Sequence, residues 1–213
     1  MSRLIENNKV IVIGEILGQF EYSHEIFGEK FYTGQLKTER TSGVSDLIPI
    51  MVSDRMVDVS ADWNGIFVEV EGSFRSYNKN EEGKKKLMLS VFVREFKQLE
   101  NVYYNDNNIE LDGYICKEVI YRKTPLGRDI SDFLIAVNRA YGKSDYIPCI
   151  AWGRNAVYLA ELEVGTRIKL CGRIQSREYT KRISETETET KTAYEVSVSK
   201  LEVVTDEKWH YIK

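Results

Sequence analysis

Two stretches decide the fold of this chain: Arg40-Thr-Ser-Gly-Val-Ser-Asp-Leu-Ile-Pro49 and Arg139-Ala-Tyr-Gly-Lys-Ser-Asp-Tyr-Ile-Pro148. Both follow the pattern RxxGxSDxIP, and they lie 99 positions apart. With that shift, residues 14–49 align with residues 113–148 without a gap, and ten of the 36 aligned pairs are identical. Unrelated sequences of average composition would share about two. A period of about 100 residues is too long for a solenoid repeat and predicts the duplication of a whole small domain.

The duplication divides the chain into two predicted domains, residues 1–104 and residues 105–213. The boundary falls in the polar stretch Asn101–Asn108, which is suited to a short linker. A length of 213 residues is compatible with two small domains. The sequence therefore predicts a tandem arrangement of two similar units.

Each repeat has the pattern of a β protein. In the second repeat, stretches rich in Val, Ile and Tyr predict strands at Tyr114–Tyr121, Arg128–Asn138, Tyr146–Ala151, Arg167–Tyr179 and Ala193–Val204. One short helix is predicted between the third and fourth strands, over Arg154–Leu162, and the first repeat has a weaker helix over Asp54–Ala61. This order predicts an all-β chain of two tandem five-stranded OB-fold Greek-key barrels, each with one short helix. A five-stranded sandwich would give the same strand pattern.

Composition narrows the class of protein. The 30 Lys and Arg residues against 33 Asp and Glu residues give a net charge of −3, so the whole chain is not basic. Apolar runs such as Val10–Ile13 are far shorter than the roughly 20 residues that cross a bilayer, and Met1–Asn7 contains no secretory signal. The odd number of cysteines (Cys116, Cys149 and Cys171) favours reduced thiols over a disulfide framework. We therefore expect a cytoplasmic protein without a membrane span.

Motifs for catalysis and metal binding are missing from the sequence. The chain has two histidines, His24 and His210, and no CxxC, HExxH, GxSxG, GxxxxGKS/T or GxGxxG motif. Its Asp and Glu residues have no spacing that indicates an acid–base pair. We predict no enzyme activity, no catalytic residue, no cofactor and no metal site.

Three motifs of the second repeat occur together in one known family. They are Ser131-Asp-Phe-Leu-Ile-Ala-Val-Asn-Arg139, Ile150-Ala-Trp-Gly-Arg154 and Gly172-Arg-Ile-Gln-Ser-Arg-Glu-Tyr179, followed by the alternating strand Tyr194–Leu201. In this order and spacing they resemble the bacterial single-stranded DNA-binding protein family over most of residues 109–204. The resemblance implies a barrel that holds single strands by stacking their bases on aromatic side chains.

The resemblance also implies which residues touch the nucleic acid. Four stacking positions can be transferred by motif, and all are aromatic in this chain: Tyr141, Tyr146, Trp152 and Tyr179. Every base has a π face, so such positions tolerate any sequence, and each stacked base contributes about 1–3 kcal/mol. Cations must follow the phosphates, because the charge of the backbone dominates affinity. The candidates are Arg122, Lys123, Arg128, Arg139, Lys143, Arg154, Arg173 and Arg177.

The first repeat lacks these features. At the four positions it has Ser42, Leu47, Ser53 and, near the last, Lys79. Residues 114–182 hold 13 Lys and Arg against 7 Asp and Glu, a difference of +6, whereas residues 1–100 hold 13 against 16, a difference of −3. We expect the first repeat to keep the barrel and to serve in assembly or auxiliary binding. The alternatives are phosphate contacts through Lys84–Lys86 and a platform relocated to other aromatic residues, namely Phe27, Phe31, Phe74 and Tyr77.

The repeated motif predicts a turn rather than a binding site. Gly43 and Gly142 can take the positive φ of a hairpin turn, and the Ser and Asp residues that follow can bond nearby backbone amides. Both repeats have the motif, although their aromatic residues differ, which favours a structural role.

These observations predict sequence-tolerant binding of single-stranded DNA in replication, recombination or repair. Members of the family assemble as four barrels, so two barrels per chain predict a homodimer. The match is incomplete, because Asp206–Lys213 lacks the acidic recruiting tail of the family and Ser184–Thr190 places three glutamates in a loop that often touches nucleic acid. These differences leave an alternative, an OB-fold interaction or assembly module such as a primosome-type accessory factor, with secondary nucleic-acid binding.

Overall fold

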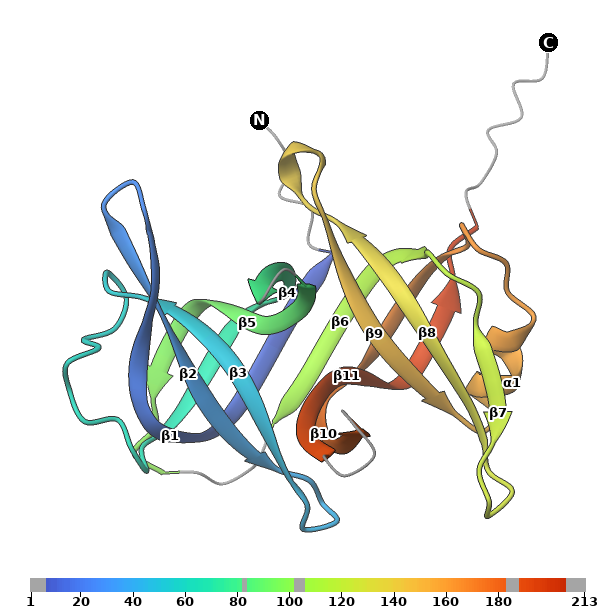
Figure 1. Cartoon of the computed structure of the whole chain (residues 1–213), viewed down its shortest axis with the longest axis horizontal. Helices are drawn as coiled ribbons and strands as arrows, with labels where there is room; N and C mark the ends of the chain where they lie inside the picture. Colours follow the sequence, from blue (N-terminus) through green and yellow to red (C-terminus); the bar gives the residue numbers. More distant parts are fainter. Residues whose placement is uncertain (1–6, 82–83, 102–105, 183–187, 206–213) are drawn as a thin grey trace.

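The computed structural model describes residues 7–81, 84–101, 106–182 and 188–205, and its strands form two barrels side by side (Figure 1). Three features noted in the sequence lie wholly or partly outside these residues: the chain end at 206–213, the acidic loop at 184–190 and the linker at 101–108. Among the described residues, no helix has the length and the apolar character to span a membrane.

The first barrel is a closed path of five strands. They are β1 (Asn8–Ile26), β2 (Glu29–Glu39), β3 (Ser45–Ser53), β4 (Phe67–Glu81) and β5 (Lys84–Gln98). Antiparallel pairs join β1 to β2, β2 to β3, β5 to β4 and β4 back to β1, and a short parallel pair joins β3 to β5. This closure is that of the OB fold.

The second barrel repeats this path with one interruption. Its elements are β6 (Asn107–Ile115), β7 (Ile120–Lys123), β8 (Asp129–Asn138), a 3₁₀ turn (Ala140–Gly142), β9 (Ser144–Trp152), α1 (Arg154–Ala160), β10 (Arg167–Arg182) and β11 (Thr188–Val203). The single strand predicted over Tyr114–Tyr121 is divided between β6 and β7, which together take the place of β1. The predicted linker is shorter than expected, since β6 already begins at Asn107. The helix predicted between the third and fourth strands is confirmed as α1.

The helix predicted over Asp54–Ala61 in the first repeat is absent, and turns take its place. One helical turn begins where the amides of Met56 and Val57 reach the carbonyl of Ser53. The side chain of Asp58 then accepts hydrogen bonds from the backbone and hydroxyl of Ser60 (3.0 and 2.6 Å). Asp and Ser side chains that bond nearby backbone compete with helix formation in this way.

The core of each barrel follows the two-residue period of its strands. On β9, Ile147, Cys149 and Ala151 are buried, and β3 buries its aligned residues at 48, 50 and 52 in the same way. Gly14 marks a point of close approach between strands, because a Cβ there would collide with the carbonyl oxygen of Lys37. Gly113 is packed equivalently against Ala136. The duplication therefore preserves the interior of the barrel.

Strands β1 and β6 pair antiparallel and join the two barrels into one continuous sheet (Figure 1). The pairing is centred on Val10 opposite Ile109, which are equivalent under the 99-residue shift. Asn8 bonds the backbone amide and carbonyl of Phe74 (2.8 and 2.7 Å), and Asn107 does the same with Ile174 (2.9 and 2.8 Å). The two barrels are thus related by a pseudo-two-fold axis between β1 and β6.

The repeated motif connects the barrels a second time. Nε and Nη2 of Arg40 donate to the buried carboxylate of Asp46 (2.7 and 2.6 Å). Asp46 Oδ1 in turn accepts the backbone N–H of Ser176 in the second barrel (2.7 Å), and the Ser176 hydroxyl accepts the N–H of Leu47 (3.1 Å).

The second copy of the motif makes the reciprocal contacts. Arg139 is paired with the buried carboxylate of Asp145, and its Nη2 also donates to the carbonyl of Ser76 (2.8 Å). Asp145 Oδ1 accepts the N–H of Ser76 (2.7 Å), and the Ser76 hydroxyl accepts the N–H of Tyr146 (2.8 Å). We call these two sets of contacts the clasps. Gly43 and Gly142 have the positive φ expected of them (79° and 68°), but the Asp residues bond the opposite barrel rather than nearby amides.

The clasps determine where two long hairpins lie. The first arm consists of residues 75–81 of β4 and 84–90 of β5, and it packs against β9 of the second barrel. The second arm consists of residues 175–182 of β10 and 188–194 of β11, and it packs against β3 of the first barrel. Each barrel therefore extends one hairpin to the third strand of the other.

Candidate nucleic-acid interface

Two of the predicted stacking residues lie on the outer face of β9. Inward-facing residues alternate along this strand, so Tyr146 and Trp152 both point outward, and each ring is more than two fifths exposed. Six residues of extended strand separate them by about 20 Å. A single strand of nucleic acid could lie along this distance with several bases between the two rings.

Tyr141 lies at the turn that precedes β9 and is fully exposed. Its φ of 63° is in the left-handed region, which is strained for a bulky residue. The ring makes no use of the core, so the fold alone does not account for a tyrosine at this strained position. We call Tyr141, Tyr146 and Trp152 the hairpin row.

Tyr179 lies apart from the hairpin row. It follows Ser176 by three residues on the second arm, beyond the clasp with Asp46 and Leu47 of the first barrel. In Figure 1 the turn between β8 and β9 lies near the top of the view, whereas the curled parts of β10 and β11 that form the second arm lie in its lower half. The structure therefore places three of the four predicted aromatic residues on the β8–β9 turn and β9, and the fourth on the second arm.

The predicted phosphate contacts fall into three groups. Arg122 pairs with Asp132 (2.9 Å), Lys123 with Asp129 (3.6 Å) and Arg177 with Glu195 (3.9 Å), and such surface pairs contribute little to stability. Arg173 donates to Gln175 (3.4 Å). In the described part of the chain no side-chain partner is found for three exposed cations, Arg128, Lys143 and Arg154.

Arg139 differs from the other predicted cations. Its guanidinium is held by Asp145 and the Ser76 carbonyl, and only a quarter of the side chain is exposed. A guanidinium committed to a buried carboxylate is not presented to a phosphate. The structure therefore assigns Arg139 to the clasp, and its prediction as a phosphate contact is withdrawn.

Polar residues that the sequence pattern did not single out fill the space beside β9. Ser197 of β11 lies opposite both Ile150 and Arg173, which places Arg173 in register with the part of β9 between Tyr146 and Trp152. Glu195 is nearly buried and accepts a hydrogen bond from Gln175 (2.7 Å). In the sequence, Glu195 stands at a polar position of an alternating strand, where a solvent-exposed side chain is expected. No pattern in the sequence therefore indicates that the Glu195 carboxylate is buried and bonded to Gln175.

Burial and hydrogen bonding shift the pKa of several side chains in the second barrel. Burial raises the pKa of the Cys149 thiol well above its usual value, which keeps it protonated. The Tyr121 hydroxyl donates to Asp129 (2.5 Å), and this bond raises the pKa of Tyr121 and lowers that of Asp129. Over the described ranges, no group of three or more His, Cys, Asp and Glu residues could hold a metal ion.

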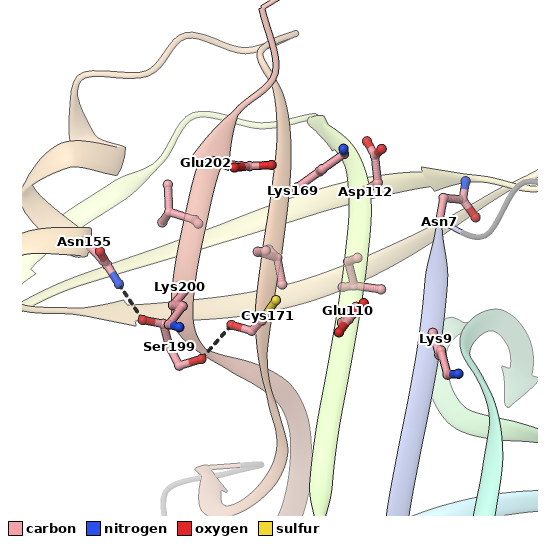
Figure 2. A pocket seen from close by; sticks show the side chains of 13 residues that line it. Asn7, Lys9, Glu110, Asp112, Asn155, Lys169, Cys171, Ser199, Lys200 and Glu202 are labelled. Carbon is pink, nitrogen blue, oxygen red and sulfur yellow. Dashed lines mark hydrogen bonds between the residues drawn. The ribbon is translucent and has the colours of Figure 1, made fainter.

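A pocket of about 670 Å³ lies on a different face, over β6, β10 and β11 (Figure 2). Its walls carry charges of both signs, including Lys169, Lys200, Glu110 and Glu202. Within it, Asn155 donates to the carbonyl of Ser199 (3.1 Å), and the Ser199 hydroxyl donates to the carbonyl of Cys171 (3.0 Å). The described lining includes no residue of the hairpin row, so the pocket is separate from the proposed interface.

The model of the single-strand binding protein family matches residues 106–204, which span the second barrel. The second barrel is therefore similar to this family over slightly less than half of the chain. Single-stranded DNA-binding protein 3 of Streptococcus agalactiae is 35% identical over 80 residues, which are 34% of this chain and 58% of that protein. Single-stranded DNA-binding protein A of Bacillus subtilis is 34% identical over 80 residues, which are 34% of this chain and 46% of that protein. The chain thus spans about half the length of these relatives.

The arrangement of both barrels also has a counterpart of known structure. The single-stranded DNA binding protein of Thermus aquaticus superposes with a TM-score of 0.73 at 20% identity, covering 93% of each chain. At this identity the likeness concerns the fold. The shared fold extends over both barrels of the chain.

Proposed function

We propose that the protein binds single-stranded DNA of any sequence along the outer face of β9, and serves in DNA replication, recombination or repair. The observation that carries this proposal is the hairpin row, three exposed aromatic rings on β9 and the turn before it, in a barrel that matches the model of the single-strand binding protein family. Rings that contribute nothing to the core can stack on bases, and stacking does not read sequence.

The cations support the same face. Arg173 lies in register with the middle of β9, and Lys143 and Arg154 flank its two ends in the sequence. Each phosphate neutralised on a single strand releases counterions, so affinity falls with salt with a logarithmic slope of about 0.7 per contact. Tyr179 and Arg177 lie on the second arm and are expected to contact DNA less than the hairpin row does.

The decisive variant is Trp152→Ala, with the aligned Ser53→Ala of the first barrel as its control. We expect Trp152→Ala to weaken binding of a fluorescein-labelled oligo-dT about tenfold, since one stacked base contributes about 1–3 kcal/mol, and Ser53→Ala to leave it unchanged. Fluorescence anisotropy over a series of salt concentrations measures both the affinity and the slope.

Duplex DNA of the same length serves as the competitor. Equal binding of single strands and duplex, or wild-type affinity of Trp152→Ala, would contradict the proposal. Absence of any binding would favour the alternative, an OB-fold module for protein interaction or assembly.

We also propose that the chain forms a homodimer, which brings together the four barrels that the family resemblance implies. Sedimentation velocity at micromolar protein should show a species of twice the chain mass of 24.7 kDa. A monomer at that concentration would remove this proposal without affecting the interface on β9.

A further inference from the structure

The first arm meets the second barrel at the end of the hairpin row. The N–H of Tyr146 donates to the Ser76 hydroxyl (2.8 Å), and the N–H of Ser76 donates to Asp145 (2.7 Å). These short bonds hold the backbone of β4 at Ser76 against the backbone of β9 at Tyr146. The outer face of β9 therefore ends beside the first barrel rather than in open solvent.

The next residue along the arm is an exposed aromatic. Ser76 is buried against the second barrel, so Tyr77 points to the opposite face of the strand, where two fifths of its side chain is exposed. Tyr77 pairs with Met88 across the arm. Tyr77 directly follows Ser76 in the sequence, and Ser76 is the residue that contacts Tyr146. An exposed ring of the first barrel therefore lies one residue along the chain from this contact.

Arg75 shares the face of Tyr77, two residues earlier on β4. Its guanidinium lies over the ring of Phe92, 4.8 Å from the centroid. Within the described residues it has no hydrogen bond or ion pair, and the charged groups that act on it are the cations Arg139 and Arg94 and the carboxylate of Asp145, which is itself paired with Arg139. A guanidinium that is bound to no carboxylate can contact an anion such as a phosphate.

The two sequence segments that contain the arms differ in net charge, just as β9 and β3 differ in aromatic residues. Residues 75–90 contain five Lys and Arg against two Asp and Glu, a difference of +3, whereas residues 175–194 contain four against four. The basic arm is the one that meets the aromatic strand β9. The neutral arm meets β3, where Leu47 and Ser53 replace the rings.

We propose that the DNA-binding surface is composite: a single strand that passes Tyr146 continues onto the first arm, where Tyr77 stacks on a base and Arg75 contacts a phosphate. This inference rests on the proposed function and extends it to the first barrel. It assigns a direct role in binding to the repeat that lacks the aromatic positions of the family. The fourth ring of the track is then Tyr77, and Tyr179 of the second arm lies outside it.

The test uses the full chain and a labelled oligo-dT long enough to pass from β9 to the arm. Tyr77→Ala should weaken binding about fivefold, and Tyr22→Ala is the matched control because Tyr22 is a more exposed tyrosine on another strand of the same barrel. Arg75→Gln should reduce the logarithmic salt slope by about 0.7, the value for one phosphate contact on a single strand. Thermal melting of each variant checks that the fold is retained.

The outcomes separate this inference from the proposal on which it rests. If Trp152→Ala weakens binding and Tyr77→Ala does not, the composite surface is wrong and the interface on β9 stands. If neither variant changes binding, both proposals fail. Equal losses in Tyr77→Ala and Tyr22→Ala would also overturn the composite surface, because the effect would not be specific to the arm.

A second pair of variants covers the case in which Tyr77→Ala unfolds the arm. Tyr77→Phe keeps the ring and should bind as the wild type does, whereas Tyr77→Leu keeps apolar volume without a π face and should lose about fivefold. Equal affinities of these two variants would contradict a stacking role for residue 77.

Discussion

Strands β3 and β9 are the equivalent strands of the two repeats, and they differ in the residues on one face. Ser45–Ser53 and Ser144–Trp152 share the buried Asp of the clasp and bury aligned residues in the same alternation. They differ where side chains point outward, with Leu47 against Tyr146 and Ser53 against Trp152. The residues that build the barrel and hold it to its neighbour were kept in both copies, and those that would meet a ligand were not.

The difference shows that the two functions of this strand are separable. Inward positions respond to packing, where a change of one methylene alters stability, while outward positions are free to diverge once binding does not require them. The second barrel therefore holds most of the proposed interface, and the first contributes its arm. Two sets of variants test this division, one on the shared aspartates and one on a residue that differs.

The largest effect is expected from the shared aspartates. Asp145→Ala leaves the guanidinium of Arg139 and the N–H of Ser76 without their partner, and Asp46→Ala does the same to Arg40 and Ser176. Removing one member of a buried ion pair costs about 3 kcal/mol. Urea denaturation should show about this loss in the free energy of unfolding for each variant.

The control for this pair is Asp132→Ala. Asp132 is paired with the half-exposed Arg122 at the surface, so its loss should cost less than about 1 kcal/mol. A loss for Asp145→Ala no larger than that of Asp132→Ala would show that the clasp does not stabilise the fold. Unequal losses for Asp46 and Asp145 would show that the two halves of the interface are not equivalent.

The smallest effect on stability is expected at the turn before β9, where the copies differ. Tyr141 has a φ of 63°, whereas the aligned Ser42 is not among the residues with positive φ. Asn tolerates the left-handed region better than Tyr, so Tyr141→Asn should raise the free energy of unfolding by about 0.5 kcal/mol. The same variant should weaken binding of oligo-dT, because it removes a ring of the hairpin row.

Ser42→Asn is the comparison for this variant and should change neither stability nor binding. Urea denaturation and anisotropy measure the two properties on the same samples. Wild-type binding by Tyr141→Asn would remove Tyr141 from the interface and leave its strained backbone without a functional reason.

Much of the fold was readable from the chain because its signals are local. The alternation of β9, the helix after Trp152 and the turn glycines Gly43 and Gly142 depend on neighbouring residues, and the 99-residue repeat doubled each signal. The failed prediction was local as well. Asp54–Ala61 has residues that bond their own backbone, and this competition decided against a helix.

The candidate site was readable only in part. The sequence motifs predict stacking by Tyr141, Tyr146 and Trp152, and local structure places these three residues on one hairpin. Arg139 and Tyr179 were placed with them because they belong to the same motifs. Their surroundings are determined by the other barrel, and no spacing within the second repeat carries that information.

By itself, the sequence determined that the chain contains two copies of a β domain, which strand residues face the interior, and that the second copy has aromatic residues where the first has Leu47 and Ser53. Only the tertiary structure decided that Asp46 and Asp145 reach across to Ser176 and Ser76. It thereby placed Ser76, the neighbour of Tyr77, against the backbone of Tyr146, and Ser176 of the second arm against β3. The reason is physical. The two-residue period of a strand indicates which of its sides is buried, and this pattern lies within each repeat. The partner of a buried carboxylate depends on how the two barrels pack against each other, and neither repeat alone contains that information.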